Sequence, residues 1–80
     1  MNIYVGNLPY RTDESDIKSL FAQYGDVISV KLIIDKVTGL KKGFGFVEMD
    51  DAGGRKAIND LNESNFNGRN IKVNMAKMRN

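Results

Sequence analysis

The chain has 80 residues and a formal net charge of +2, and a chain of this length forms one domain on a single core. It contains no cysteine and no histidine, which excludes disulfides and Cys/His metal sites, and we expect no metal or other cofactor. There is no long apolar run, and no basic segment followed by an apolar core at the N-terminus. We therefore expect no membrane span and no secretory signal, which favours the cytoplasm, or the nucleus in a eukaryote.

The first half of the chain predicts a strand, a helix and a second strand. Residues 2–6 alternate between outward and inward positions, as in a strand. Thr12 is a good N-cap for a helix of about twelve residues, which ends at Gly25. The apolar stripe of this helix has helical spacing: Ile17, Leu20, Phe21 and Tyr24. Residues 27–34 alternate like a strand, in which Val30, Leu32 and Ile34 face inward.

The second half predicts a strand, a helix and a final strand. A turn-rich basic loop over residues 35–41 precedes a strand over residues 42–49. Asp50 or Asp51 would cap a second helix that runs to about Leu61 or Asn62. We expect its start to be frayed or late, because Gly53-Gly54 in the first turn costs roughly 1 kcal/mol per residue relative to alanine. Residues 65–68 form a turn or short hairpin, and residues 70–74 form the last strand.

The order strand-helix-strand-strand-helix-strand predicts an α+β, ferredoxin-like βαββαβ sandwich. Two helices would cover one face of a four-stranded antiparallel sheet. The domain would span residues 1–76, followed by a basic C-terminal tail over residues 77–80. Charge is uneven along the chain: residues 31–47 carry +3, residues 68–80 carry +4, and the remainder carries −5. If the two basic segments share a surface, the protein has one positive face.

The third strand has its large and small residues on the wrong faces for an ordinary half-buried strand. In KGFGFVEM (residues 42–49), a period of two puts Lys42, Phe44, Phe46 and Glu48 on one face. The other face receives Gly43, Gly45, Val47 and Met49. Eighty residues cannot readily cover both faces of a sheet, so we interpret the two phenylalanines as displayed to solvent. Displayed aromatics beside a lysine suit stacking on bases and pairing with phosphate.

This octamer resembles the longer signature of the RNA recognition motif family, [Lys/Arg]-Gly-[Phe/Tyr]-[Gly/Ala]-Phe-Val-x-[Phe/Tyr], at seven of its eight positions. The exception, Met49, falls on the core face. IYVGNL (residues 3–8) resembles the family's shorter signature, with Tyr4 as its displayed aromatic. The resemblance covers nearly the whole chain, and extends to small single-domain bacterial RNA-binding proteins and to the RNA-binding part of glycine-rich proteins. It implies sheet order 4-1-3-2, with Tyr4 and Phe46 side by side on the open face.

The resemblance implies binding of single-stranded RNA on that face. Tyr4 and Phe46 would each stack under one base, Phe44 would insert against the sugars between them, and Lys42 would contact the linking phosphate. Base identity would be read largely by the last strand and the residues just after it. Secondary contacts are expected from Lys31, Ile33, Lys41, Glu48, Lys72, Asn74, Ala76 and Lys77. Gly43 and Gly45 would be backbone requirements of a closely packed strand.

Enzyme activity is not expected, because no His or Cys is present to activate any of the serines. Two other interpretations stay open. One is a protein-interaction module that binds a partner chain through its sheet or helical face. Family members that have changed role in this way tend to lose or bury the displayed aromatics, so the three aromatics here favour RNA. The other is single-stranded DNA binding, which differs only by contacts to the 2′-hydroxyl. Alone, the chain is expected to be monomeric.

Overall fold

The computed structural model describes residues 1–76, so Lys77 and the rest of the predicted basic tail lie outside the described residues. The elements follow the predicted order, and residues 65–70 form a short two-stranded ribbon before the last strand. They are β1 (Asn2–Gly6), α1 (Glu14–Ala22), β2 (Val27–Ile34), β3 (Lys41–Met49), α2 (Asp51–Leu61), β4 (Asn65–Phe66), β5 (Arg69–Asn70) and β6 (Lys72–Met75).

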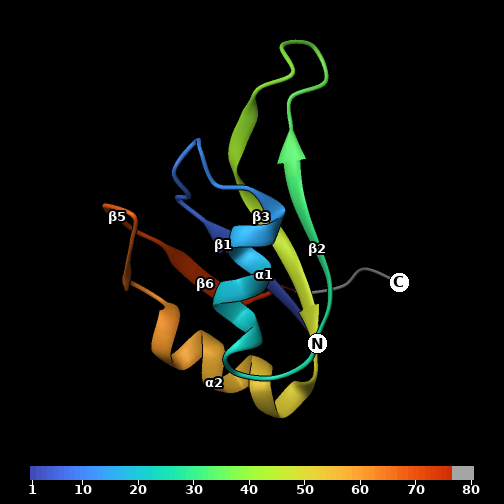
Figure 1. Ribbon diagram of the computed structural model, residues 1–80, viewed down its shortest axis with the longest axis vertical. Helices are drawn as coiled ribbons and strands as arrows, with labels where there is room; N and C mark the ends of the chain where they lie inside the picture. Colours follow the sequence, from blue (N-terminus) through green and yellow to red (C-terminus); the bar gives the residue numbers. More distant parts are fainter. Residues whose placement is uncertain (77–80) are drawn as a thin grey trace.

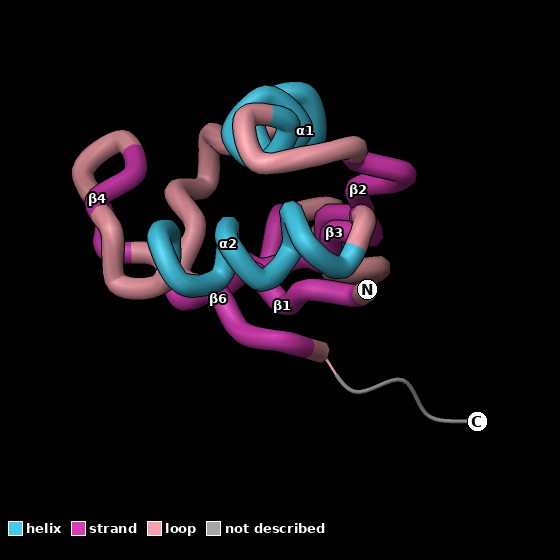
Figure 2. Tube along the Cα trace, turned by 90° about the horizontal axis from the view of Figure 1, so that it is seen from below, coloured by secondary structure: helices cyan, strands magenta, loops and turns pink. Residues whose placement is uncertain are grey.

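The main sheet has four antiparallel strands in the order β2-β3-β1-β6 (Figure 1). Because β6 is the fourth long strand of the chain, this is the predicted order 4-1-3-2 read from the other edge. Both helices lie on the same side of the sheet (Figure 2). Helix α1 packs against β2, and α2 packs against β6 and β1. The ferredoxin-like sandwich is therefore confirmed, and the signature strands β1 and β3 are central neighbours.

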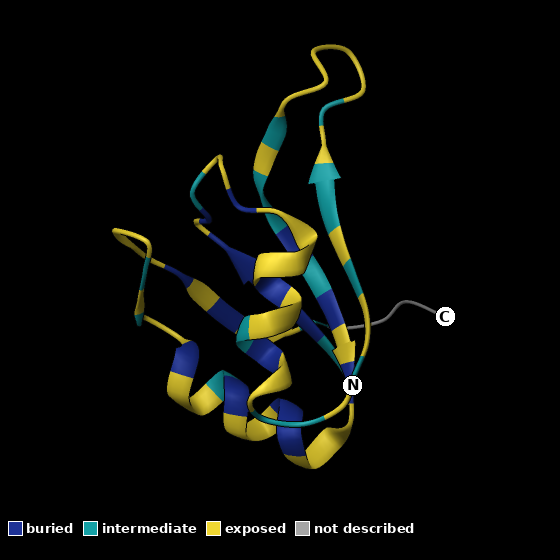
Figure 3. Ribbon diagram, viewed as in Figure 1, coloured by how far each residue is buried: buried dark blue, intermediate teal, exposed yellow. Residues whose placement is uncertain are grey.

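The core lies between the helices and the sheet, and strand alternation explains which residues enter it. Buried positions along β1, β3 and β6 face the helices (Figure 3). Five of the apolar residues there are at most 1% exposed, namely Ile3, Val5, Val47, Met49 and Val73, whereas Met75 at the end of β6 is 60% exposed. Helix α1 contributes Ile17 and Phe21, and α2 contributes Ala57 and Leu61. The core face that helical spacing predicted for α1 is thus confirmed, and side chains from both helices pack against the sheet.

Helix α1 begins one residue later and is shorter than predicted. Its N-cap is Asp13, whose backbone N–H donates to Asp16 Oδ2 at 2.9 Å. The prediction that Thr12 caps this helix is wrong, because Thr12 is drawn into the turn after Pro9 and its side chain is buried. The helix has nine residues rather than about twelve. Its last turn tightens, with the Tyr24 N–H bonded three residues back to the Phe21 carbonyl.

Helix α2 begins at Asp51 without delay, so the predicted frayed start is wrong. Asp50 is the N-cap, and its carboxylate accepts hydrogen bonds from Gly53 N at 2.8 Å and from Asp26 N at 2.9 Å. Gly53 is buried, and a Cβ there would lie 2.6 Å from the Tyr24 carbonyl oxygen. The intrinsic cost of glycine is therefore offset by a close approach between α2 and the end of α1, which a single-segment propensity argument does not include.

Two further details concern the edges of the fold. Ile34 was predicted to face inward, but it is 51% exposed. It follows a register shift in the β2–β3 pairing and lies beside Asp13 and Lys41, at the start of α1, where no helix covers it. The predicted short hairpin is confirmed as β4–β5, with Asn67 and Gly68 both at positive φ, as a two-residue turn of this kind requires.

Candidate nucleic-acid interface

Three aromatic rings gather at the centre of the sheet, on the face opposite the helices. Tyr4 comes from β1, and Phe44 and Phe46 come from β3, where Phe46 is the direct cross-strand partner of Tyr4. Ring centroids are 5.9 Å apart for Tyr4–Phe44, 6.0 Å for Tyr4–Phe46 and 6.2 Å for Phe44–Phe46. All three side chains are partly exposed. We call these three residues the aromatic platform.

Other apolar side chains of β1 and β3 fill the core on the opposite face of the sheet, so the core does not need the platform residues. Ile3 and Val5 flank Tyr4 along β1 and are buried, and Val47 and Met49 are buried on β3. The three rings therefore cannot be required to fill the core between sheet and helices. A cluster of partly exposed aromatic side chains on a small protein marks a binding surface.

Glycines shape the platform from both strands. The Tyr4 ring lies over Gly6, where an added Cβ would stand 2.2 Å from the tyrosine oxygen. On β3, a Cβ at Gly45 would stand 2.4 Å from the Lys31 carbonyl oxygen of β2. Gly43 has φ of +84° and its carbonyl accepts from Leu8 N at 2.8 Å. Gly43 and Gly45 are thus backbone requirements, as predicted.

Polar residues extend the platform across the sheet. The pairing register aligns Lys31 on β2 with Phe46, then with Tyr4 and with Asn74 on β6, in one row across all four strands. In the adjacent row, Glu48 pairs with Ser29, whose hydroxyl donates to Glu48 Oε1 at 3.5 Å. Lys31, Asn74 and Glu48 are exposed. The predicted secondary residues of this group are therefore beside the rings.

The other predicted site residues are placed less uniformly. Lys42 is exposed, two residues before Phe44, and forms no ion pair within the described residues. Lys72 is exposed but paired with Glu63. Ile33 is partly buried on β2. Ala76, also partly buried, donates its N–H to the Asn2 carbonyl at 2.9 Å, which continues the β6–β1 pairing. Lys77 is not among the described residues.

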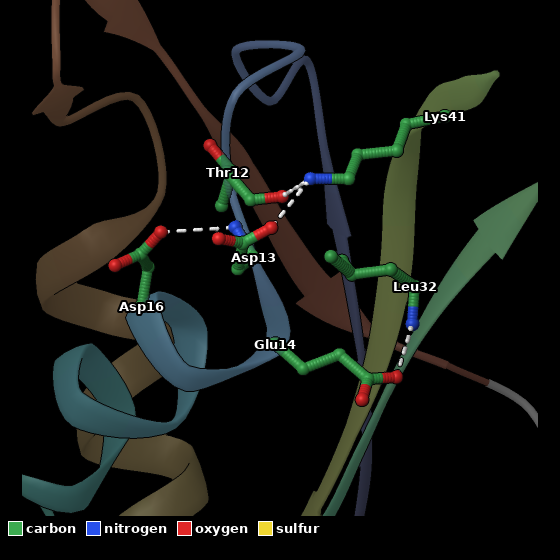
Figure 4. Close-up of polar contacts among 6 residues, drawn as sticks. All are labelled: Thr12, Asp13, Glu14, Asp16, Leu32 and Lys41. Carbon is green, nitrogen blue, oxygen red and sulfur yellow. Dashed lines mark hydrogen bonds and ion pairs between the residues drawn. The ribbon is translucent and has the colours of Figure 1, made fainter.

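Lys41 does not join the aromatic platform. Its ammonium donates to the Thr12 carbonyl at 2.6 Å and to Asp13 Oδ1 at 2.8 Å, at the N-terminus of α1 (Figure 4). Its charge is compensated by Asp13 on the helical side of the sheet. Lys41 is one of the residues for which a secondary RNA contact is predicted, and that contact stays a prediction. Lys41 lies an odd number of residues before Phe44 and Phe46, and in a strand this spacing places it on the opposite face.

A pocket that the sequence did not predict lies at one end of the sheet. Tyr10 and Leu40 line this pocket, and they are 71% and 67% exposed. The signal available in the sequence was weak: a lone tyrosine after a proline, and a lone leucine in a polar loop.

Within residues 1–76, no group of acidic side chains is arranged to hold a metal ion, and no helix is long and apolar enough to cross a membrane.

Comparison with known proteins identifies the family. The RNA recognition motif profile matches residues 3–72, and the chain belongs to the RNA recognition motif family. The putative RNA-binding protein RbpD of Nostoc is 50% identical over 80 residues, covering 99% of this chain and 85% of that protein. Among solved structures, RNA-binding protein PG1 has 49% identity and a TM-score of 0.94 over 100% of this chain and 98% of that one. The Rna15 RRM with bound RNA (GU) has 31% identity and a TM-score of 0.85, covering 96% of this chain and 83% of that one.

Proposed function

We propose that the protein binds single-stranded RNA on the open face of the sheet, through the aromatic platform. The observation that carries this proposal is the cluster of three rings, 5.9–6.2 Å apart between centroids, on the face that α1 and α2 leave uncovered. Family membership and the RNA-bound structure of the similar Rna15 domain support it. Flat rings on an uncovered sheet can stack on bases only where those bases are exposed. Single-stranded RNA exposes its bases, whereas a double helix keeps them stacked inside.

In this proposal each residue has one role. Tyr4 and Phe46 each stack under one base, and Phe44 contacts the sugars between them. Lys42 and Lys31 contact phosphates at the edges of the platform. Asn74 offers a donor and an acceptor to a base edge, Glu48 accepts from a base amine, and Ala76 contributes main-chain groups. No catalytic step is part of this function.

The expected affinity is modest. Stacking contributes roughly 1–3 kcal/mol per base and tolerates any base, so two stacks with a few phosphate contacts suggest roughly micromolar binding. Each phosphate contact on a single strand adds about −0.7 to the slope of log K against log salt. Contacts from Lys31, Lys42 and Lys72 would therefore give a slope near −2, after Lys72 leaves Glu63.

The test is fluorescence anisotropy of a labelled random-sequence RNA oligomer at low salt, with the wild type and the Phe46→Ala variant. We expect Phe46→Ala to weaken binding by roughly 1–3 kcal/mol. Ile28→Ala is the matched control, because Ile28 is 67% exposed and lies beside Glu14 and Lys18 of α1, away from the platform. Equal affinities for the two variants would contradict the proposal. A random-sequence DNA oligomer of the same length, run in parallel, measures how much the 2′-hydroxyl contributes.

A further inference from the structure

Strand β2 lies at one edge of the main sheet, and the described residues leave its outer side unpaired (Figure 1). The opposite edge is protected, because Val73 N of β6 donates to Asn62 Oδ1 at 2.9 Å. On β2 the outward group is Leu32 N, whose partner is Glu14 Oε2 at 3.5 Å, the outer limit of a hydrogen bond (Figure 4). Proteins usually shorten or charge an open edge, whereas β2 has eight residues and a single charge, that of Lys31.

A groove between α1 and β2 runs beside this edge. It consists of two hollows that share part of α1. Lys18 and Ile28 line the first hollow, whereas Leu32 and Ile34 line the second, where Glu14 contacts Leu32 N. Ile28 and Ile34 are 67% and 51% exposed. Neither Lys18 nor Glu14 forms an ion pair among the described residues, so the groove has a cationic end and an anionic end, each with an exposed isoleucine.

The two ends of the groove are complementary under a two-fold rotation. The N–H and C=O of one strand residue point to the same side, so Val30, two residues before Leu32, also presents its groups outward. If Val30 pairs with Val30 of an antiparallel second copy, Leu32 lies opposite Ile28 of that copy. Because Glu14 is beside Leu32 and Lys18 is beside Ile28, each glutamate then faces a lysine of the other copy.

Other registers of the same antiparallel pair oppose like charges. An axis at Lys31 places the two Lys31 side chains opposite each other, and an axis at Leu32 brings the two Glu14 carboxylates together. With the axis at Val30, Lys31 lies opposite Ser29 of the second copy, on the face that carries the platform. The charges therefore favour one register, and they favour it for a second copy of this chain.

We propose that the β2 edge pairs with the β2 edge of a second copy, and that the protein forms a two-fold dimer in which two four-stranded sheets become one. The monomer expected from the sequence would then be the dilute form. Both aromatic platforms would lie on the same face, with their Phe46 residues three strand spacings apart, about 14 Å, and with both Lys31 side chains between them. One RNA strand that contacts both platforms would bind more tightly than on either alone. The dimer does not require RNA, whereas this use of it rests on the proposed function.

The test is sedimentation velocity of the RNA-free protein from about 10 μM to 1 mM, because so small an interface suggests a dissociation constant near about 100 μM. Lys18→Glu and Glu14→Lys each put like charges across the two-fold axis, and each alone is expected to weaken dimerisation at least about ten-fold. In an equimolar mixture the two variants complement each other, and dimerisation should return to within about three-fold of wild type. Lys56→Glu is the matched control, because Lys56 is exposed on α2 and does not line the groove.

Recovery in the mixture separates an interface from a fault within one chain. Glu14 and Lys18 are four residues apart on α1, so each substitution also changes an intrachain pair, but mixing cannot repair that change. A mixture that dimerises no better than its components would overturn the proposal, and so would wild-type dimerisation that both substitutions leave unchanged. A wild type that stays monomeric up to about 1 mM would also overturn it, and would leave the edge to a strand of another protein.

The dimer can fail without the RNA-binding proposal, and the reverse also holds. Phe46→Ala is expected to dimerise like the wild type, because Phe46 lies on β3, away from the paired edge. A loss of dimerisation in Phe46→Ala would contradict the β2 interface. Each platform is complete within one copy, so Ile28→Ala stays a valid control for RNA binding by a single platform, although it should weaken the dimer.

Discussion

Tyr4 on β1 and Phe46 on β3 are direct cross-strand partners, with their ring centroids 6.0 Å apart and their planes at 65°. Such edge-to-face pairs are favourable beyond the area they bury, by roughly 0.5–1.5 kcal/mol. Here the pair also meets Phe44, with Phe44 and Phe46 at 90° to each other. The rings support one another on a surface that no helix of the described residues covers, which lets them stay ordered while they are partly exposed.

This arrangement predicts different effects for two phenylalanine-to-alanine substitutions. Phe46→Ala removes a partly exposed ring and should lower the free energy of unfolding by only about 1 kcal/mol. Phe21→Ala removes a ring that is 0% exposed and should lower it by about 3–5 kcal/mol. Urea denaturation of both variants measures the difference. Similar losses in the two variants would mean that Phe46 belongs to the core and that the face assignment is inverted.

Gly6 is predicted to act on RNA binding without contacting RNA. An alanine Cβ at this position would stand 2.2 Å from the Tyr4 oxygen and 2.6 Å from Cζ, so the ring must move away from the strand. Gly6→Ala should therefore weaken RNA binding by an amount up to the loss of one stacked base, roughly 1–3 kcal/mol. The measurement is anisotropy, together with the chemical shifts of the Tyr4 ring protons.

The matched control for Gly6→Ala is the same substitution in a Tyr4→Ala background. Once the ring is absent, the added methyl group has nothing to displace, and the two losses should not add. A double-mutant cycle with an interaction energy near zero would show that Gly6 acts through the backbone rather than through Tyr4.

The fold could be predicted from the sequence because local patterns and overall topology agree. The alternation in β1, β3 and β6 and the helical spacing of Ile17 and Phe21 both place the apolar residues on the side of the helices. The platform followed from one conflict in that pattern, two phenylalanines opposite two glycines. Periodicity determines which face of the sheet a side chain occupies, and the face is the main information needed to identify the platform residues.

What the sequence could not predict depends on contacts between distant segments. Gly53 is acceptable at a helix start only because the Tyr24 carbonyl approaches it. Thr12 loses its cap role to Asp13 because the turn after Pro9 buries it. The pocket at Tyr10 is formed by two loops about thirty residues apart, and neither loop carries a pattern of its own. Tertiary contacts override local preference at each of these places.

Asp50 predicts a pH dependence of stability. Hydrogen bonds from the backbone N–H groups of Gly53 and Asp26 to its carboxylate lower the pKa of Asp50 in the folded state. Near this pKa the folded protein therefore binds fewer protons than the unfolded chain. The stabilisation that Asp50 contributes is fully present above the unfolded-state pKa, and it is lost as the pH falls through the lowered folded-state pKa. Asp50→Asn, which cannot titrate, should have a lower unfolding midpoint than wild type at neutral pH. The difference between the two should shrink below about pH 4.

That difference can be measured by thermal unfolding of both proteins between about pH 2 and pH 7. Asp26→Asn is a suitable control, because Asp26 is exposed and its carboxylate forms no ion pair among the described residues. If the two variants follow the same pH profile, the Asp50 hydrogen bonds do not contribute to acid sensitivity.

Two adjacent lysines are predicted to have separate roles: Lys41 stabilises the fold, and Lys42 contributes to RNA binding. Lys42→Gln should weaken RNA binding and reduce the magnitude of the salt slope by about 0.7, because one phosphate contact is lost. Lys41→Gln should leave the salt slope unchanged and instead lower the free energy of unfolding by up to about 1 kcal/mol, because it breaks the contacts to Thr12 and Asp13. Anisotropy titrations from about 20 to 300 mM salt, with urea denaturation of both variants, measure the two effects. The two substitutions remove the same charge from neighbouring positions, so each is the control for the other. A fall in salt slope for Lys41→Gln equal to that for Lys42→Gln would mean that RNA draws Lys41 away from Asp13, and that the helical-side contact is not its role in the complex.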